Sequence, residues 1–460
     1  MRYVVLGVCW VLLGCDDAAM RERLSPGDAQ ATRPRARNVI LVTVDTLRAD
    51  VLGAYGGDAR TPAIDELARS GWLFSQCYSA SMLTNPAHAS LMTSLYPRDH
   101  GVYDNESGIQ DGARTLAVAL ARRGMQTGAV IGFAHLNPKV SNLGQGFEHV
   151  VLAERTERRA DSTSREALTL IDSLDWHAPF FLWLHYTDPH APYDPPADHP
   201  PRPRAEAARI PMTQARRAAT GIQRRHPWFR RVLNELATTE ELRARYVAEV
   251  EVVDAGIATL VAGLRTRSLL DDTALVITAD HGENLGEHEL YFHHGGLYAP
   301  TVHVPLIVHA PGLSAGSFDA MVESVDVAPT VLDLVGVPRW EPMRGRSLRA
   351  LAESARWARR YAFSEHMERQ QVAVRSAEGL LILHQRSSRQ FPTYPFVAGQ
   401  RERLDVRADP REQTLLRPDD PRADELEQAL GHFLEAGLHL AARPAQERDE
   451  ASLRALGYVE

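Results

Sequence analysis

Two runs of apolar residues, each ending in an aspartate, constrain the fold of this chain more than any other feature. They are NVILVTVD, at 38–45, and ALVITAD, at 274–280. Apolar runs without alternation are typical of strands that are buried on both faces, as in a parallel sheet. MQTGAVIGF, FFLWLHY and VPLIVHA are similar. The sequence therefore predicts an α/β fold, with a mixed, mostly parallel central sheet flanked by helices on both faces.

Helical patterns alternate with these strands. In TPAIDELARSG, Thr61 is a predicted N-cap, Pro62 takes the first helical position and Gly71 ends the helix. Ligands of α/β sheets gather at the carboxyl ends of the strands. Asp45 and Asp280 both stand at such ends. Their placement is the first indication of a metal site.

The length of 460 residues allows one large core and a smaller subdomain. We assign 38–345 to the main domain and 346–460 to a C-terminal α+β subdomain, because the sequence pattern changes near residue 345. In the subdomain we expect a helix at 348–363, a hairpin at 372–385 and a long amphipathic helix at 424–442.

The N-terminus resembles a bacterial lipoprotein signal. MRYVVLGVCWVLLG has one positive charge and an apolar run too short to span a membrane, and LLGC follows the lipobox pattern. We expect a signal peptide at 1–15, a lipid on Cys15 and a flexible tether at 16–37. This predicts a lipid-anchored, extracytoplasmic protein of the cell envelope, associated with the membrane. An ordinary signal peptide is the alternative.

Charge and cysteine content exclude some classes of protein. A net charge of -8 with 24% charged residues is ordinary for a globular protein, and the mild acidity argues against a nucleic-acid partner. Of the three cysteines, only Cys77 would remain in the mature chain, so no disulfide within that chain is expected. We interpret Cys77 as a packed core thiol.

Histidines and aspartates concentrate in three short segments. Asp280 and His281 lie in TADHGENLGEH. His185, Asp188 and His190 lie in HYTDPHAPY, and His293 and His294 lie in YFHHGGLY. Two carboxylates and an imidazole at neighbouring strand ends suit one divalent ion. Any single histidine is explained equally well as a core residue, but the whole set favours a site.

Six blocks in order resemble the sulfatase family of the alkaline-phosphatase superfamily. They are NVILVTVDTLRADVLGAYG, LTNPAHASLMTSLYPRDHGV, FFLWLHYTDPHAPYDPP, ITADHGENLGEH, VPLIVHAPG and VDVAPTVLDLVG, and they cover about residues 38–340. In the tail, RLDVRADPREQTLL and LRALGYVE resemble the family's C-terminal turn and usual ending. The resemblance implies a metal-dependent enzyme that acts on anionic esters of small molecules, lipids or glycans.

The resemblance implies that Asp45 and Asp280 are metal ligands, together with the nucleophile Thr84. Two positions depart from the calcium-binding pattern. Thr46 stands where a second aspartate is common, and His281 stands where asparagine is common. Since calcium prefers oxygen ligands and imidazole suits zinc or manganese, we expect one divalent ion, with manganese or zinc favoured and calcium possible.

The position of the nucleophile departs most from the sulfatase pattern. Sulfatases carry Cys-x-Pro-x-Arg, whose cysteine is oxidised to formylglycine, whereas this chain reads Thr84-Asn85-Pro86-Ala87-His88. We expect Pro86 in the first turn of a helix and Asn85 as its cap. Thr84 would then lie where free backbone N–H groups favour an anion.

A threonine nucleophile changes the chemistry that the resemblance implies. The gem-diol of formylglycine expels sulfate without a second attack, whereas a sulfated threonine needs water to attack sulfur. A phosphorylated threonine is an ordinary intermediate. Thr84 therefore favours hydrolysis or transfer of phosphate or phosphonate esters by a metal-activated hydroxyl. A sulfuric ester hydrolase is the alternative. A non-catalytic envelope binding protein is a third hypothesis, from a different class.

The family's GKWHLG block aligns with residues 132–137, so Phe133 replaces the lysine that grips sulfate and His135 is kept. Lys139, the only lysine of the chain, either replaces that charge or lies on the surface by chance. The remaining catalytic candidates are histidines that could protonate the leaving group or bind oxygens of the ester. The candidate catalytic residues are Thr84, His88, His135, His185 and His294.

An arginine-rich segment at 196–231 follows the HYTDPHAPY block and looks like an insertion near the site. We interpret it either as a basic lid that recruits an anionic substrate or lipid headgroup, or as a solvated helical insertion. Its arginines are Arg202, Arg204, Arg209, Arg216, Arg217, Arg224, Arg225, Arg230 and Arg231.

Overall fold

The structure, a computed structural model, describes residues 36–444 except 155–156, 176, 206–209, 355–358 and 418. The predicted signal peptide with Cys15, most of the tether and the LRALGYVE ending lie outside these residues. Ala36, near the end of the predicted tether, already belongs to the fold, because it is buried and its N–H donates to the Leu334 carbonyl at 3.0 Å. Within the described residues, no helix has the length and apolarity to cross a bilayer.

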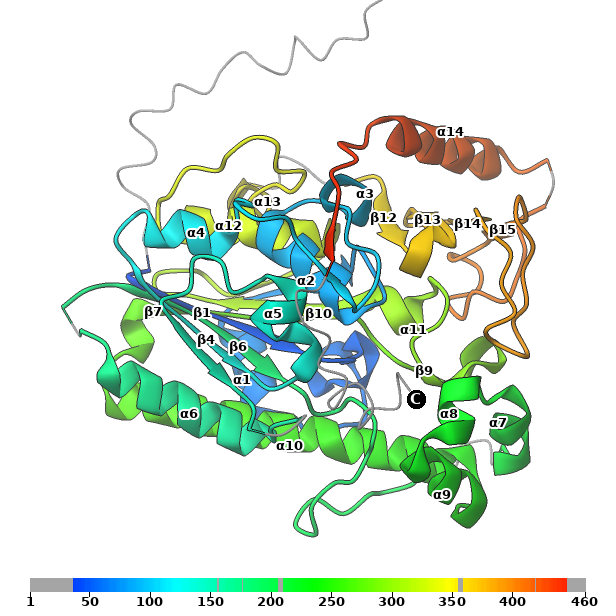
Figure 1. Ribbon diagram of the computed structural model, residues 1–460, viewed down its shortest axis with the longest axis horizontal. Helices are drawn as coiled ribbons and strands as arrows, with labels where there is room; N and C mark the ends of the chain where they lie inside the picture. Colours follow the sequence, from blue (N-terminus) through cyan, green and yellow to red (C-terminus); the bar gives the residue numbers. More distant parts are fainter. Residues whose placement is uncertain are drawn as a thin grey trace, which may run out of the picture. The chain divides into compact units, whose positions relative to one another are not determined.

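An eight-stranded sheet carries the core, and every predicted strand run forms one of its strands (Figure 1). β1 pairs in parallel with β6 and β7, whereas β10 is antiparallel to β7 and β2. The expected mixed, mostly parallel sheet is therefore confirmed. The strand order is β11 (Gly316–Glu323), β2 (Trp72–Tyr78), β10 (His303–His309), β7 (Thr273–Ala279), β1 (Asn38–Val44), β6 (Phe180–Tyr186), β4 (Gln126–Ile131) and β5 (His149–Leu152).

Helices cover both faces of this sheet (Figure 1). The helix α1 begins at Pro62 after the N-cap Thr61 and ends before Gly71, as predicted. It buries Ile64 and Leu67. One face carries α1 (Pro62–Ser70), α6 (Ala160–Ser173) and α10 (Thr239–Thr266), and the other carries α2 (Thr84–Thr93), α4 (Leu116–Ala121) and α12 (Val327–Leu334).

Short elements fill the connections, and the predicted insertion is helical. It contains α7 (Met212–Ala218), α8 (Gly221–Arg225) and the start of α9 (Pro227–Glu235). The other short elements are α3 (Pro97–His100), α5 (Pro138–Ser141), α11 (Ala299–Val302), β3 (Ser107–Gly108) paired with β16 (Arg443–Pro444), and β8 (Asn284–Leu285) paired with β9 (Tyr291–His293).

The C-terminal part forms a smaller antiparallel sheet, as predicted for an α+β subdomain. Its order is β12 (Ala362–Glu365), β13 (Gln371–Arg375), β14 (Leu380–His384) and β15 (Arg401–Leu404). The helix α14 (Pro421–Glu435) packs on β13 and β14. The expected hairpin is therefore confirmed as β13 and β14.

Two helices of this part are shorter than predicted. The helix α13 (Arg349–Ser354) does not continue to residue 363, because Phe363 pairs with Val374 in the sheet. The helix α14 ends at Glu435 rather than near residue 442. Beyond it, the N–H groups of Leu438 and His439 donate to the Asp99 carboxylate and the Arg98 carbonyl, so the backbone bonds to α3 instead of continuing the helix.

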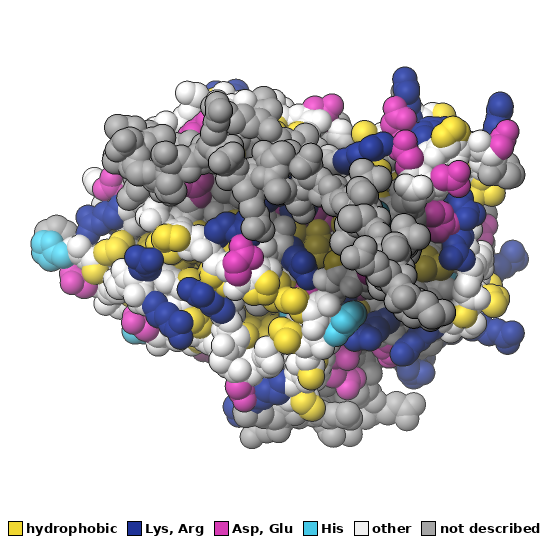
Figure 2. All heavy atoms as spheres, turned by 90° about the horizontal axis from the view of Figure 1, so that it is seen from above, with side chains coloured by type: hydrophobic (Ala, Val, Ile, Leu, Met, Phe, Trp, Pro, Cys, Tyr) yellow, Lys and Arg dark blue, Asp and Glu magenta, His cyan; other side chains and the backbone are white. Residues whose placement is uncertain are grey.

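Ion pairs are spread over the exposed surface of the C-terminal part. Arg403 and Arg401 both contact Glu427 of α14, and Arg360 contacts Glu425. On the face in Figure 2, the described acidic and basic side chains are interspersed. Exposed pairs of this kind stabilise a fold only slightly.

Candidate active site

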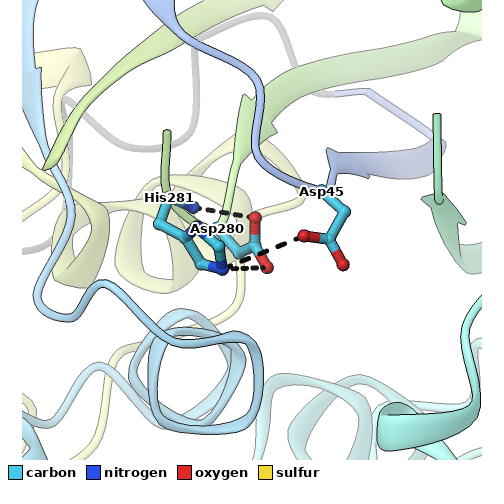
Figure 3. A group of neighbouring side chains, drawn as sticks. All are labelled: Asp45, Asp280 and His281. Carbon is cyan, nitrogen blue, oxygen red and sulfur yellow. Dashed lines mark hydrogen bonds and ion pairs between the residues drawn. The ribbon is translucent and has the colours of Figure 1, made fainter. Parts of the chain in front are cut away.

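Asp45 and Asp280 lie side by side at the carboxyl edge of the sheet. Val44 is in register with Ala279, so the two aspartates directly follow a paired position of β1 and β7. His281 comes next in the chain (Figure 3). One ligand atom from each of the three residues lies within 4.8 Å of the others. The structure therefore brings together the three protein side chains that the strand ends predicted as a metal site.

The three side chains are fully buried, and most of their polar atoms lack a hydrogen bond. Both carboxylate oxygens of Asp45, Oδ2 of Asp280 and Nε2 of His281 have no hydrogen-bond partner among the described residues. Oδ1 of Asp280 accepts the N–H of His281 at 2.8 Å and that of Thr46 at 3.2 Å. Buried unpaired polar atoms are costly, so this cluster is built to receive a ligand.

The electrostatics fit a cation. Burial, and then the charge of Asp280, hold the pKa of Asp45 well above its usual range. Burial raises the pKa of Asp280 to about 6 and lowers that of His281 to about 4. A divalent ion would compensate two buried carboxylates, and a neutral imidazole is the form that binds metals. The residues present therefore fit one divalent ion.

Thr84 is the first residue of α2, and the cap differs from the prediction. Leu83, not Asn85, is the N-cap, with extended backbone, and its carbonyl accepts the N–H of Ala87. The Asn85 amide instead donates to the carbonyl of Asn105 at 3.1 Å. Asn85 is therefore the second residue of the helix, and its side chain contacts the following loop instead of capping the helix. Thr84 nevertheless begins the helix, at its N-terminal end, where anions are favoured.

His88 lies one turn after Thr84 and faces the metal-site cluster. Its Nδ1 is 2.8 Å from the Thr84 carbonyl and 3.7 Å from Oδ2 of Asp280, and its Nε2 is 3.0 Å from Oγ1 of Thr43. Burial lowers the pKa of His88, so it does not supply the permanent positive charge of the arginine in the family motif.

Of the other predicted histidines, His185 lies beside the metal-site cluster, with Nε2 3.6 Å from Oδ2 of Asp45. The ring of His294 lies 4.6 Å from that of His281, measured between centroids. The ring of His135 packs against Phe133 at 4.9 Å, and burial lowers the pKa of His135 to about 3. Two of the three histidines therefore adjoin the cluster directly.

A cavity of about 450 Å³ opens beside the cluster. His135 and His294 line it, and so does Leu83, the residue before Thr84. Lys139 is exposed on α5 and does not line the cavity, so the structure does not bring this charge to the site. The lining is Met82, Leu83, Asp104, Asn105, Glu106, His135, Glu157, His190, Ala191, Pro192, Thr220, Ile222, Gln223, His226, Phe229, Glu283, Phe292, His293, His294, Gly295, Met367, Glu368, Gln390 and Phe391.

The insertion at 196–231 contributes to the wall of this cavity, but none of its described arginines lines it. Thr220, Ile222, Gln223, His226 and Phe229 line the wall. Five arginines of this part of the chain instead contact carboxylates or backbone carbonyls. The contacts join Arg202 to Glu251, Arg204 to Glu240, Arg231 to Glu235, and Arg216 and Arg224 to carbonyls of the insertion's own helices. These contacts agree better with a solvated insertion than with a basic lid.

Two carboxylates of the wall were missed from the sequence. Glu283 is 2% exposed, and its Oε2 accepts the hydroxyl of Tyr193 at 2.9 Å. Burial raises the pKa of Glu283 to about 8, and burial followed by the charge of Asp188 raises that of Glu157 to about 8. Glu283 is within the DHGEN segment and could have been found there, whereas nothing in the sequence around Glu157 marks it.

Comparison with known families agrees with this geometry. The sulfatase family profile matches residues 37–337, and the profile of the N-sulphoglucosamine sulphohydrolase C-terminal region matches residues 286–436. The chain belongs to the sulfatase family. The resemblance of the six sequence blocks is thereby confirmed, and this member of the family is a hydrolase of sulfuric or phosphoric ester bonds.

Relatives of both chemistries are found. The N-acetylglucosamine-6-O-sulfatase of Bacteroides thetaiotaomicron is 24% identical over 84% of this chain and 83% of its own. A protein solved with its substrate D-glucosamine-2-N,6-O-disulfate has a TM-score of 0.72 at 23% identity, covering 87% of this chain and 98% of its own. The phosphonate monoester hydrolase of Agrobacterium radiobacter has a TM-score of 0.67 at 20% identity, covering 88% and 95%. Both solved structures share the fold of this sulfatase-family chain.

Proposed function

We propose that this sulfatase-family enzyme hydrolyses or transfers phosphate or phosphonate esters, with Thr84 as the nucleophile. The metal ligands would be Asp45, Asp280 and His281, together with Thr84. The observation that carries the proposal is a threonine hydroxyl at the start of α2, where the family has its cysteine. One turn later, His88 lies 3.7 Å from the carboxylate of Asp280.

The proposed reaction has two displacement steps. A divalent ion bound at the cluster would stabilise negative charge on the ester and acidify the hydroxyl. Thr84 Oγ1 loses its proton and bonds to phosphorus, while the bond from phosphorus to the alcohol oxygen breaks and the alcohol leaves with a proton. Water then attacks the phosphothreonine, which releases phosphate and restores the hydroxyl.

The histidines orient groups in this scheme. Burial holds the pKa values of His185 and His294 well below the usual range, so both imidazoles are neutral and each offers one N–H. His294 lines the cavity and can donate to an ester oxygen there. We assign it to binding of non-bridging oxygens rather than to proton donation, because a neutral imidazole is a weak acid.

A sulfuric ester hydrolase is the second candidate, and the sulfatases among the relatives favour it. A panel of matched aryl phosphate, phosphonate, phosphodiester and sulfate esters separates the two. We expect phosphate or phosphonate turnover to exceed sulfate turnover at saturating manganese or zinc. Higher turnover of the sulfate ester would decide for the alternative, and no turnover of any ester would favour a non-catalytic binding protein.

Variants of Thr84 test the nucleophile. We expect Thr84→Ala to lower turnover by about three orders of magnitude or more while the ion is retained, because Asp45, Asp280 and His281 remain as ligands. Thr84→Ser should keep substantial activity. Thr84→Cys should gain no sulfatase activity, because His88 still occupies the arginine position. Mass spectrometry of enzyme quenched with a phosphate ester should find phosphate on the Thr84 peptide. Wild-type turnover by Thr84→Ala would contradict the covalent route.

We also propose lipid anchoring in the cell envelope through Cys15, which is supported by the LLGC pattern alone. Labelled palmitate should enter the wild-type protein but not Cys15→Ser, and the variant should leave the membrane fraction. A wild-type protein that fractionates without membranes would rule out the anchor.

A further inference from the structure

The cavity beside the metal-site cluster has an unusually acidic lining for an enzyme of anionic esters. Its described lining contains five carboxylates and neither lysine nor arginine. The carboxylates belong to Asp104, Glu106, Glu157, Glu283 and Glu368. We propose that this cavity binds an alkylammonium group on the alcohol part of the ester. The inference rests on the proposed function and names the substrate class of the same site.

A buried acceptor in the wall has no partner. Oε1 of Glu283 forms no hydrogen bond among the described residues, although the residue is 2% exposed and lines the cavity. Its other oxygen is held by the hydroxyl of Tyr193. Oε1 of Glu157, which also lines the cavity, forms no hydrogen bond among the described residues either, and the nearest imidazole nitrogen, Nδ1 of His190, is 4.0 Å away. A buried carboxylate oxygen without a partner is costly, and a ligand cation would compensate it.

Aromatic rings complete the wall. Phe229, Phe292 and Phe391 all line the cavity. The ring of Phe391 stacks on His293 with centroids 4.5 Å apart, which holds it in place. Ring faces attract quaternary and primary ammonium groups, and carboxylates nearby add to this attraction. Apolar rings beside carboxylates therefore suit an organic cation better than a hydrated metal ion.

Further carboxylates lie on exposed parts of the lining. Glu368 is exposed, and Oδ1 of Asp104 is fixed by the N–H of Glu106 at 2.9 Å and the hydroxyl of Ser107 at 2.7 Å. Several like charges at an entrance raise the local concentration of the opposite charge. They also repel a substrate that carries a second sulfate or phosphate near the reacting ester. The lining thus selects against polyanionic esters.

The cavity lies where the alcohol part of the substrate would be. Leu83 precedes Thr84, Glu283 follows His281 by two positions, and the ring of His294 contacts that of His281. Leu83, Glu283 and His294 all line the cavity. An ester held with phosphorus or sulfur near Thr84 therefore extends its alcohol into this space. Its volume of about 450 Å³ accommodates a small alkylammonium alcohol.

An isosteric pair of substrates tests the charge alone. Choline phosphate and neohexyl phosphate differ only in nitrogen against carbon, and choline sulfate and neohexyl sulfate form the same pair for the other chemistry. With the metal-loaded enzyme, we expect kcat/KM to favour the choline ester by about tenfold in whichever pair is turned over. Ethanolamine phosphate extends the test to a primary ammonium. Equal or better use of the neohexyl ester would overturn the proposal.

Glu283→Gln tests the wall, because it keeps the shape and removes the carboxyl group that a bound cation would hold in its charged form. We expect the choline-to-neohexyl ratio to fall several-fold, while Glu425→Gln, in an exposed pair on α14, leaves the ratio and both rates as in the wild type. Since Glu283 also accepts from Tyr193, the ratio rather than either rate is the readout. An unchanged ratio in Glu283→Gln would refute a role for this carboxylate.

A binding measurement separates failure of this proposal from failure of the proposed function. Calorimetric titration with choline and with neohexanol needs no turnover. We expect choline to bind more tightly to the wild type than to Glu283→Gln, and neohexanol to bind more weakly than choline to both. If neither ester pair is hydrolysed but choline binds selectively, the ester reaction is wrong and the cation site stands. If choline binds no better than neohexanol, the cation site is wrong.

Discussion

Two clusters of buried carboxylates in this protein are built in opposite ways. At the end of β1 and β7, Asp45 and Asp280 are fully buried and keep three carboxylate oxygens without a hydrogen bond among the described residues, with only histidine rings of lowered pKa nearby. Near β11, Glu323 and Asp326 are equally buried, but Arg359 contacts both, at 2.8 Å for Glu323 and 2.9 Å for Asp326. Both clusters lose hydration in the same way, and only the second one has its partner in the chain.

The pairing extends beyond one arginine. The hydroxyl of Tyr96 donates to Glu323 at 2.8 Å, and the N–H of Phe363 donates to the same carboxylate at 2.7 Å. Burial still raises the pKa of Glu323 to about 7, but the carboxylate is fully hydrogen-bonded. The difference teaches that burial alone does not mark a functional site. Burial without an internal partner does, because the missing partner is then a ligand.

Removing one carboxylate from the unpaired cluster should have the largest effect on function. We expect Asp280→Asn to lose the bound ion and to lower turnover by about a thousandfold or more. Asp272→Asn, at the other end of the same strand, is the control and should keep both. Elemental analysis and steady-state kinetics measure the two effects. Full metal content in Asp280→Asn would show that this aspartate is not a metal ligand.

Breaking the paired cluster should instead affect stability. Arg359→Met leaves Glu323 and Asp326 buried without their cation, and we expect the free energy of unfolding to fall by about 3–5 kcal/mol. The neighbouring Arg360, 68% exposed and paired with Glu425, is the matched control. Arg360→Met should cost about 1 kcal/mol or less. Urea unfolding of both variants measures the difference, and equal losses would show that burial of the pair is unimportant.

Adding the missing partner should stabilise the unpaired cluster. A divalent ion that binds only the folded chain, at a concentration a hundredfold above its Kd, stabilises it by about 2.7 kcal/mol. We expect thermal unfolding to shift upward with manganese or zinc, and the shift to vanish in Asp45→Asn. The imidazole of His281 predicts a smaller shift with calcium. An equal or larger shift with calcium would contradict our choice of ion.

The sequence predicted the unpaired cluster because its residues stand at strand ends. Asp45 and Asp280 each close an apolar run, and the parallel register of two such runs puts their ends together. The fold class followed from the same runs. The strand β2, with sequence WLFSQCY, was not predicted, because its polar residues interrupt the apolar pattern and only pairing with β10 and β11 fixes it.

Contacts distant in sequence explain the other failures. The end of α14 is set by Arg98 and Asp99, more than three hundred positions earlier in the chain. The position of Asn85 depends on Asn105. The carboxylate of Glu157 lines the cavity, and the backbone of this residue is held by an antiparallel bridge to Phe133. Sequence motifs therefore locate the metal-ligating residues well. The residues that line the cavity and the ends of the helices depend on tertiary contacts that no local pattern encodes.

The smallest expected effect is a pH dependence confined to the metal-free protein. Burial raises the pKa of Asp280 to about 6 from a usual value of 3.8, so the folded state binds this proton more tightly than the unfolded state. The contribution of this proton to the free energy of unfolding is therefore complete below the unfolded pKa, and it is lost as the pH rises through the folded pKa.

At pH 7, Asp280→Asn should therefore be more stable than the wild type without metal, by on the order of 2 kcal/mol. The difference should shrink toward pH 4 and reverse at pH 7 when the ion is added. Unfolding curves of both proteins at the two pH values, with chelator and with metal, measure it, and a metal-free variant no more stable than the wild type at pH 7 would mean that the cluster has an internal partner after all.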